Sequence, residues 1–372
     1  MEMRGLSAHN SATPFRLARA RRSIPMVSQR LSSFCLAWGA CVLAALLAGM
    51  APASAAEVTL RFAHFWPAVS GPHRDVYQAW ADAVTQASGG RIAVELYPGA
   101  TLTKAPAQYD AVRSRLADVT ATIQGYTANR FPLSQIVELP GLVKNGKHGA
   151  CILQALYDDG LIKDEYRDTH PLFFFTHGPG HLHTRERVVK TPADLAGLRL
   201  RRPTVVTGAL LESLGAKPVA LPAPETYPAM QRGVIDGAAL PWEAMGSFRL
   251  NELAPYHTEV GGLYTLAFVV TMNSDVYNAL PPDLKAVLTA HSGAAWAEKA
   301  GRVFDGLDTV GRDEALKAGH TVVTIEGGAD NPAWKPALDQ ATDAYLTDLE
   351  TRGLPARAVY ARAKALAASC SP

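Results

Sequence analysis

An arginine-rich segment contains the residue best placed to bind an anion. Residues 197–203 read GLRLRRP, a short alternating run that a proline ends. This pattern predicts a strand with Arg201 at its carboxyl end. Ligands of open α/β sheets bind outside such ends, and a guanidinium can hold a carboxylate through two parallel charge-assisted hydrogen bonds. The alternative is that these arginines are solvated or pair with surface acids, as exposed arginines usually do.

Three histidines within seven residues form a second candidate. Residues 177–183 read HGPGHLH, so His177, His181 and His183 could supply imidazole ligands to zinc. No H-E-x-x-H or C-x-x-C pattern accompanies them, and the Gly-Pro-Gly between the first two is typical of a turn after a strand. The other two interpretations are hydrogen-bonding groups that line a cleft and structural histidines. We favour these over a metal centre and assign no metal ligand.

Aromatic residues follow two of the predicted strands. Phe65 and Trp66 end the first strand, and Trp242 with Glu243 follows a strand predicted at 234–238. A cleft would lie at these positions, although aromatic residues more often belong to a core. The sequence contains no G-x-S-x-G, P-loop or dinucleotide-binding motif. The absence of these motifs is weak evidence against catalysis. We predict that the protein is not an enzyme and assign no catalytic residue and no cofactor.

The elements that would position these residues alternate between strands and helices. Period-two patterns predict strands near 58–62, 92–96 and 119–123, with amphipathic helical patterns between them. The alternation resumes after residue 170, and residues 263–273 are the most apolar strand candidate. This order predicts an α/β fold with a parallel sheet. A helical tract from residue 281 to about 318 could form a long spine.

Length and charge restrict the class of protein. The chain has 372 residues, of which 48% are hydrophobic, enough for a large core and two lobes. The formal net charge is +2, but residues 1–55 contain six arginines and one acid, so the remainder carries 2 − 5 = −3. Fibrous and disordered classes are excluded, and a basic nucleic-acid-binding protein is disfavoured.

The amino-terminal segment has the pattern of a secretory signal peptide. Residues 31–50 are uncharged and mostly apolar, basic residues precede them, and Ala53-Ser54-Ala55 is a small-x-small cleavage pattern. Met26 is an alternative start, and a membrane anchor is the alternative interpretation. We predict that residues 1–55 are removed and that the mature protein is periplasmic and not membrane-embedded.

Two cysteines remain after this cleavage. Cys151 and Cys370 would form a disulfide in an oxidising compartment if they lay close together, which the sequence does not show. Cys151 also lies on a predicted apolar helix face, where a buried thiol is the simpler interpretation. No motif of a cysteine nucleophile surrounds either residue.

Several ordered motifs resemble one protein family. They are the segment 197–203, the segment 214–219 (LGAKPV) and the segment 225–237 (ETYPAMQRGVIDG), supported by 126–132 (YTANRFP), 138–140 (ELP) and Asn273 ahead of 279–284 (ALPPDL). From about residue 57 to the end, the chain resembles the solute-binding subunit of tripartite ATP-independent periplasmic (TRAP) transporters.

The resemblance implies a two-lobed Venus-flytrap fold with crossover strands that captures an organic acid for a sodium-driven membrane permease. The expected lobes are residues 57–178 with 265–305, and residues 179–264 with 306–372. The family's carboxylate-binding arginine falls on Arg201. His181 stands where sialic-acid-type members have a second arginine, and Leu240 where they have an asparagine. These differences favour a small apolar or aromatic monocarboxylate, or a 2-oxo acid, over a sugar acid.

We expect Arg201 to bind the ligand carboxylate and closure to bring His64, Tyr126 and Trp242 around the rest of the ligand. Trp66, Glu243, His181 and Leu240 complete the expected ligand-binding set. Two alternative functions stay open. One is an exported metal-dependent hydrolase that uses His177, His181 and His183, and the other is a ligand-sensing module of a signalling system.

Overall fold

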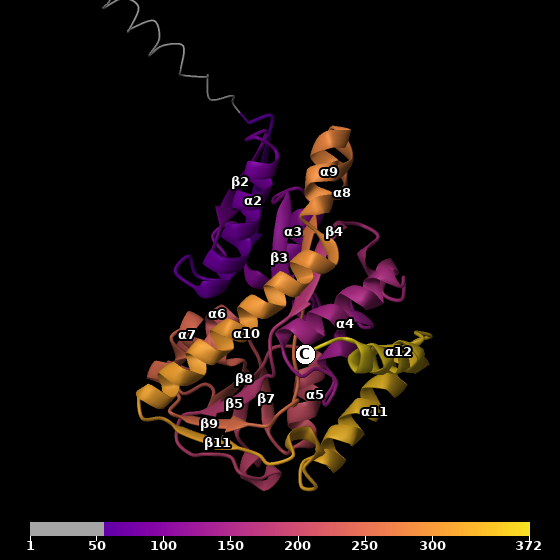
Figure 1. The fold of residues 1–372 in the computed structure, drawn as a ribbon. Helices are drawn as coiled ribbons and strands as arrows, with labels where there is room; N and C mark the ends of the chain where they lie inside the picture. The colour runs from indigo at the N-terminus through magenta and orange to yellow at the C-terminus, as the bar shows by residue number, and fades with distance from the viewer. Residues whose placement is uncertain (1–55) are drawn as a thin grey trace, which may run out of the picture. The chain divides into compact units, whose positions relative to one another are not determined.

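The protein is described by a computed structural model that covers residues 56–372 (Figure 1). The predicted signal peptide, its alternative start at Met26, and Cys35 and Cys41 lie outside these residues. Within residues 56–372, no helix has both the length and the hydropathy needed to cross a bilayer.

The strands form two sheets. The first has the order β2-β1-β3-β10-β4 and the second the order β11-β9-β5-β8-β6-β7. The strands of the first sheet are β1 (Val58–His64), β2 (Ile92–Tyr97), β3 (Val119–Ile123), β4 (His170–Thr176) and β10 (Ala267–Met272). Those of the second are β5 (His181–Thr184), β6 (Arg199–Arg202), β7 (Lys217–Ala220), β8 (Gly237–Leu240), β9 (Tyr256–Glu259) and β11 (Thr321–Thr324).

The helices pack around these sheets (Figure 1). The α-helices are α2 (Ala79–Ala87), α3 (Gln108–Arg113), α4 (Gly146–Asp158), α5 (Val205–Ser213), α6 (Ala223–Gln231), α7 (Trp242–Ser247), α8 (Ser274–Ala279), α9 (Pro282–Ala290), α10 (Gly293–Lys317), α11 (Lys335–Thr351) and α12 (Ala356–Ser369). A π-helical turn, η1 (Pro72–Gln78), leads into α2, and short 3-10 turns are η2 (Ala105–Ala107), η3 (Gln124–Tyr126), η4 (Ser134–Glu138), η5 (Lys163–Tyr166), η6 (Pro192–Leu195), η7 (Leu250–Glu252) and η8 (Gly328–Asp330).

Both sheets are mixed, so the prediction of a parallel sheet is wrong for one strand in each, β10 in the first and β5 in the second. Strands β1, β2 and β3 are parallel, whereas β10 runs antiparallel between β3 and β4. All six residues of β10 are buried, because the strand lies in the interior of the sheet with neighbours on both sides. A continuous apolar run indicates burial but not strand direction, which explains the error.

The predicted helical tract at 281–318 is two helices. Helix α9 ends at Ala290, and His291 and Ser292 separate it from α10. The side chains of both residues bond back to carbonyls of α9, His291 to Val287 and Ser292 to Leu288. These bonds and Gly293, which follows at a positive φ of 66°, end the first helix without a proline, so a tract judged by its lack of proline did not reveal the break.

The 25-residue helix α10 approaches elements beside both sheets. A Cβ atom on Gly301 would lie 2.6 Å from the carbonyl oxygen of Gly146 in α4, and one on Gly311 would lie 2.3 Å from that of Trp242 in α7. Glycine at these two positions therefore lets α10 pack closely on both neighbours. The long helix agrees with the expected spine.

Two carboxylates one turn apart on α10 bond the amino ends of the same two helices. Asp305 accepts from the amides of Gly146 (2.5 Å) and Lys147 (3.0 Å) at the start of α4. Asp308 accepts from the amide of Glu243 (2.7 Å) at the start of α7. Amide groups at helix starts lack intrahelical partners, so both carboxylates satisfy them and hold the spine to its neighbours.

The carboxyl-terminal helix is joined to the first sheet's side of the molecule. Helix α12 packs on α4, and a disulfide links Cys151 to Cys370. The interpretation of Cys151 as a buried thiol is therefore wrong: Cys151 is exposed, and its neighbours Ile152 and Leu153 form the buried face.

The strands divide between the sheets along the predicted lobe boundaries. Strands from 57–178 and 265–305 form the first sheet, and strands from 179–264 and 306–372 form the second. Helix α12 packs on α4 although its residues were assigned to the second lobe. The lobe boundaries accordingly remain a prediction.

Candidate ligand-binding site

Three of the predicted site residues meet at one edge of the second sheet. His181 pairs with Leu240 in the β5–β8 ladder, and Arg201 pairs with Ala238 in the parallel β6–β8 ladder. Since β6 and β8 end at this edge and β5 begins there, their side chains gather outside the carboxyl ends of parallel strands. Ligands of α/β proteins bind at such edges.

Arg201 is a buried cation with uncharged partners. It is 1% exposed, and its guanidinium donates to the carbonyl oxygens of Leu221 (2.9 Å) and Ala239 (3.0 Å) and to the Tyr126 hydroxyl (3.1 Å). Among residues 56–372 no acidic side chain pairs with it, whereas Arg199 on the same strand pairs with Asp236. A guanidinium has five N–H groups. Three are used, and the two that remain match the two oxygens of one carboxylate.

Tyr126 connects the segment that follows β3 of the first sheet to Arg201 of the second. It lies in η3, directly after β3, and its hydroxyl oxygen also accepts from the amide of Ala223 (2.8 Å), the first residue of α6. Both lone pairs of that oxygen therefore accept hydrogen bonds, from Arg201 and from Ala223. Its own proton is left to donate, and a carboxylate bound to Arg201 would be a suitable acceptor.

An aromatic cluster adjoins this polar group. Phe65 lies 5.7 Å from the Tyr126 ring and stacks on Trp66 at 3.8 Å between ring centroids. Trp66 in turn contacts Tyr77 (5.2 Å) and Phe268 (5.6 Å). Trp66, which follows β1, is buried, and Phe65 connects it to the Tyr126 ring.

Four side chains around this cluster carry buried polar atoms without a hydrogen-bond partner among the described residues. The atoms are Nδ1 of His64, the hydroxyl of Tyr77, Nε2 of His177 and the hydroxyl of Tyr264. Buried polar groups are normally paired. Such a concentration beside a buried arginine fits a site that a polar ligand completes.

His64 and Trp242, two predicted site residues, are partly committed to other contacts. Nε2 of His64 lies 3.0 Å from Nδ1 of His73, and burial lowers the pKa of His64 to about 3. The Trp242 indole donates to Glu259 (3.0 Å), and its ring contacts that of His181 at 5.9 Å. Trp242 therefore reaches the Arg201 edge through its ring and not through its N–H group.

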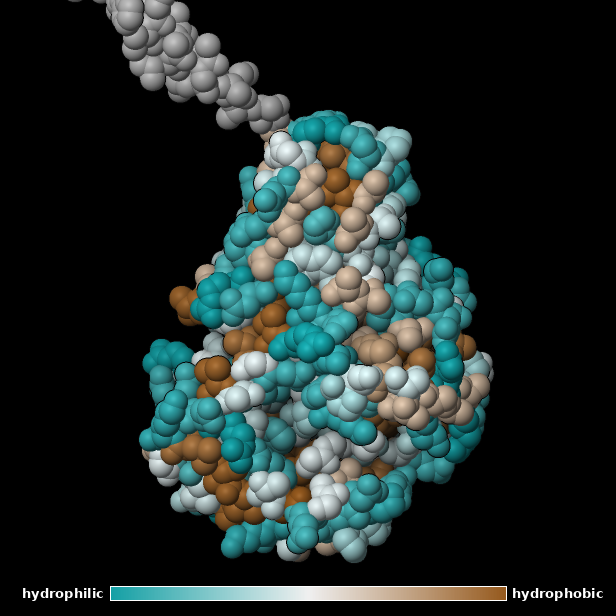
Figure 2. Space-filling model, viewed as in Figure 1, coloured by the Kyte–Doolittle hydropathy of each residue, from teal (hydrophilic) through white to brown (hydrophobic). Residues whose placement is uncertain are grey.

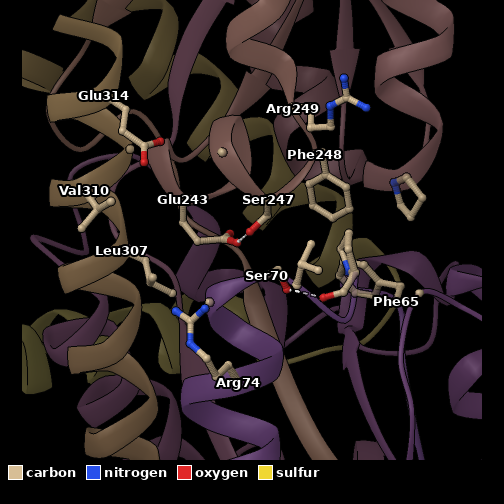
Figure 3. Close-up of a pocket in the computed structure, with 17 residues that line it drawn as sticks. Phe65, Ser70, Arg74, Glu243, Ser247, Phe248, Arg249, Leu307, Val310 and Glu314 are labelled. Carbon is tan, nitrogen blue, oxygen red and sulfur yellow. Dashed lines mark hydrogen bonds between the residues drawn. The ribbon is translucent and has the colours of Figure 1, made fainter. Parts of the chain in front are cut away.

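Glu243 faces a separate cavity. This cavity, of about 550 Å³, lies between residues that follow β1, residues of α7 and residues of α10 (Figure 3). Its walls include Phe65, Arg74, Glu243, Phe248, Leu307 and Glu314, but not Arg201. The Glu243 carboxyl accepts from Ser247, and burial raises its pKa to about 7.

Burial also raises the pKa of Asp308, well above its ordinary value. Its carboxylate accepts from the Glu243 amide, so the two acids lie close together at the α7–α10 contact.

Outside the cavity, hydrophilic residues predominate on the face shown in Figure 2, with hydrophobic residues in small groups.

The three clustered histidines do not converge on a common point. His183 Nε2 bonds the carbonyl of Leu240 (3.1 Å), and its Nδ1 lies 2.7 Å from Nδ1 of His257. No group of three or more potential ligands among residues 56–372 is arranged to hold a metal ion. The hydrolase alternative that required His177, His181 and His183 together is not supported by this geometry.

Tyr264, which the sequence prediction left out, and His177, which it considered as a cleft-lining histidine, both lie within the electrostatic influence of Arg201. Tyr264 precedes β10 and His177 follows β4, so both lie at one edge of the first sheet, and the charge of Arg201 acts on the pKa of both. The signal for Tyr264 was Gly180, where a Cβ atom would lie 2.1 Å from the tyrosine ring. The contact between Gly180 and Tyr264 could not be inferred from the sequence, because it depends on the antiparallel direction of β10.

Two sheets, facing edges and a buried arginine between them define a two-lobed ligand-binding protein. A family model described as "Bacterial extracellular solute-binding protein, family 7" matches residues 62–348. The chain belongs to this family, and the resemblance to TRAP solute-binding proteins is confirmed.

Solved structures support the same assignment. A TRAP solute binding protein from Rhodoferax ferrireducens T118, in complex with copurified benzoate, is 38% identical, with a TM-score of 0.81 over 84% of this chain and 98% of that one. A marine metagenome TRAP protein specific for aromatic acid ligands, in complex with 3-hydroxybenzoate, is 36% identical, with a TM-score of 0.82 over 86% of this chain and 100% of that one.

A third structure is more distant. A TRAP periplasmic protein from Bordetella bronchiseptica with bound (R)- and (S)-mandelate is 28% identical, with a TM-score of 0.78 over 84% of this chain and 99% of that one. These likenesses confirm the predicted two-lobed α/β fold of periplasmic binding proteins.

Proposed function

We propose that this protein captures an aromatic monocarboxylate in the periplasm and delivers it to a TRAP membrane permease. Family membership supports the general role, an organic-acid-binding subunit of a transporter. The aromatic ligand, the periplasmic location of this chain and its permease partner are the parts that we propose.

The observation that carries the proposal is the unpaired, buried guanidinium of Arg201. Leaving a charge buried without a counter-ion costs on the order of several kcal/mol. An anion with two coplanar oxygens would remove that cost by accepting the two remaining N–H groups, with the Tyr126 hydroxyl as a third donor. The mature chain is acidic overall, so recognition of an anion must come from this local group.

The aromatic part of the proposal rests on the side chains around Arg201. Phe65, Trp66 and Phe268 form an aromatic cluster that adjoins Tyr126, the hydrogen-bond partner of Arg201, and a flat apolar ligand would pack against such a cluster better than a hydroxylated sugar. Leu240, predicted in place of an asparagine, ends β8 at this edge and is buried. The ligands of the three similar structures, benzoate, 3-hydroxybenzoate and mandelate, are all aromatic carboxylates.

Ligand binding would be coupled to closure through Tyr126, which contacts elements of both predicted lobes. Closure excludes water and strengthens the ion pair between ligand and arginine. A ligand shifts the balance between open and closed forms only through its higher affinity for the closed form. We include His64, Trp66, His181 and Trp242 in the proposed ligand-binding set, and Glu243 at its outer cavity.

A calorimetric screen of purified mature protein tests the proposal. The panel contains benzoate, 3-hydroxybenzoate, mandelate, pyruvate and glucuronate. We expect at least one aromatic acid to bind with micromolar or lower Kd, and glucuronate to bind at least a hundredfold more weakly. Tighter binding of glucuronate or pyruvate than of every aromatic acid would contradict the proposal. A His181→Ala variant should change the order of affinities.

A further inference from the structure

The neutral ring of His177 presents a hydrogen-bond acceptor in the candidate site. Its Nδ1 faces the carbonyl oxygen of Gly178, which can only accept a hydrogen bond, so Nδ1 must carry the proton. Burial lowers the pKa of His177 to about 3, and the ring is therefore neutral at physiological pH. It follows that Nε2 carries no proton and offers only a lone pair.

The residues around His177 hold its imidazole ring in this orientation. The hydroxyl of Thr265 donates to the His177 carbonyl (2.7 Å) and lies 3.4 Å from Nδ1. The rings of Tyr264 and Phe268 contact the imidazole edge-to-face at 5.9 Å and 5.8 Å between centroids. An imidazole fixed between two aromatic rings and a backbone bond has little freedom to turn Nε2 elsewhere.

Nε2 is fully buried and has no partner among residues 56–372. While the ring stays neutral, a carboxylate does not satisfy Nε2, since both groups are acceptors and would repel one another. A keto oxygen cannot satisfy it either. A ligand hydroxyl can, and an unsatisfied buried acceptor costs about 1–3 kcal/mol when the ligand lacks one.

From this arrangement we infer that the ligand is a hydroxylated aromatic monocarboxylate, whose hydroxyl donates to Nε2 of His177 while Arg201 holds the carboxylate. The inference rests on the proposed function and narrows it. His177 would thus determine specificity for a hydroxyl group over hydrogen, methoxy or oxo groups. The inference requires a hydroxyl donor on the ligand, and this hydroxyl could be on the aryl ring or at the 2-position of the acid chain.

Two matched ligand series separate these positions. The ring series is benzoate, 3-hydroxybenzoate and 3-methoxybenzoate, and the chain series is phenylacetate, mandelate and phenylglyoxylate. In at least one series we expect the hydroxylated acid to bind about tenfold or more tightly than both companions, which corresponds to about 1.4 kcal/mol. Equal affinities within both series would overturn the inference. If no aromatic acid bound at all, the proposed function would fail with it.

Variants test whether His177 is the acceptor. In His177→Phe, the hydroxyl advantage should fall to twofold or less. His170→Phe is the matched control, because His170 begins the same strand and stacks on Tyr277 instead. Its hydroxyl advantage should equal that of the wild type. Circular dichroism checks folding, and if His177→Phe does not fold, His177→Gln, which keeps an acceptor, must retain part of the advantage. An advantage that survived in folded His177→Phe would overturn the assignment.

Discussion

The hydroxyl oxygen of Tyr126 lies 3.1 Å from Nη2 of Arg201 and thereby connects an element after β3 to the anion-binding arginine of the second sheet. The same oxygen accepts from the amide of Ala223 at the start of α6. One phenol therefore links η3 of the first predicted lobe to β6 and α6 of the second, the two parts that the proposed closure would bring together.

Removal of this hydroxyl should weaken ligand binding. In Tyr126→Phe, two donors lose their acceptor, and we expect the Kd for the best aromatic acid to rise about tenfold to a hundredfold. Stopped-flow fluorescence should show most of the change in the dissociation rate, because the closed form loses a contact. Tyr345→Phe is the control, since the Tyr345 hydroxyl donates to the carbonyl of Pro132 away from Arg201. Equal affinities for both variants would contradict the role of Tyr126.

Two glycines of α10 should respond to alanine in opposite directions. In Gly301→Ala the new Cβ would lie 2.6 Å from a backbone oxygen of α4, so we expect a loss of about 1–3 kcal/mol in the free energy of unfolding. Nothing lies within 4 Å of a Cβ at Gly306, and Gly306→Ala should gain about 0.5–1 kcal/mol. Urea denaturation measures both, and a Gly301→Ala protein as stable as Gly306→Ala would contradict the close packing of α10 on α4.

A buried acid should make stability depend on pH. Burial raises the pKa of Glu138 to about 8, against 4.5 in the unfolded chain. The folded state thus binds more protons than the unfolded state between these values, and its stability falls as pH rises through that range. Glu138→Gln mimics the neutral acid, so the wild type should lose up to about 1.4 kcal/mol per pH unit relative to it between pH 5 and 8.

Thermal or urea unfolding at several pH values measures this difference. Exposed Glu350→Gln serves as the control, and its stability relative to the wild type should change little over the same range. A constant difference between wild type and Glu138→Gln from pH 5 to 8 would show that Glu138 is ionised throughout.

The disulfide should stabilise the fold through the chain that it closes. Cys151 and Cys370 are 219 residues apart in sequence, and restricting so long a loop in the unfolded state contributes about 2–5 kcal/mol. Reductant should therefore lower the Tm, and the Cys151→Ser, Cys370→Ser double variant should reproduce the lowered value without responding to reductant. Hydrogen exchange should increase first in α12. An unchanged Tm in the double variant would contradict this effect.

The position of Arg201 could be predicted because a short strand, a terminating proline and an arginine are all local features of the sequence. The direction of β10 could not be predicted from local features. Tyr264 was therefore missed as well, because its place in the site depends on β10 being antiparallel. The break at His291 was missed because no proline interrupts the tract, although Gly293, at a positive φ of 66°, lies directly after it. The disulfide needed α12 to fold back on α4, a contact between residues far apart in sequence.

The most direct test of the account is isothermal titration of the best aromatic acid into Arg201→Gln, with Arg199→Gln as the control. Arg199 lies on the same strand but pairs with the surface acid Asp236, so its variant should bind the ligand within about twofold of the wild type. Arg201→Gln should bind at least a hundredfold more weakly, because the bidentate charged contact is lost. Wild-type affinity in a folded Arg201→Gln protein would contradict the claim that Arg201 holds the carboxylate.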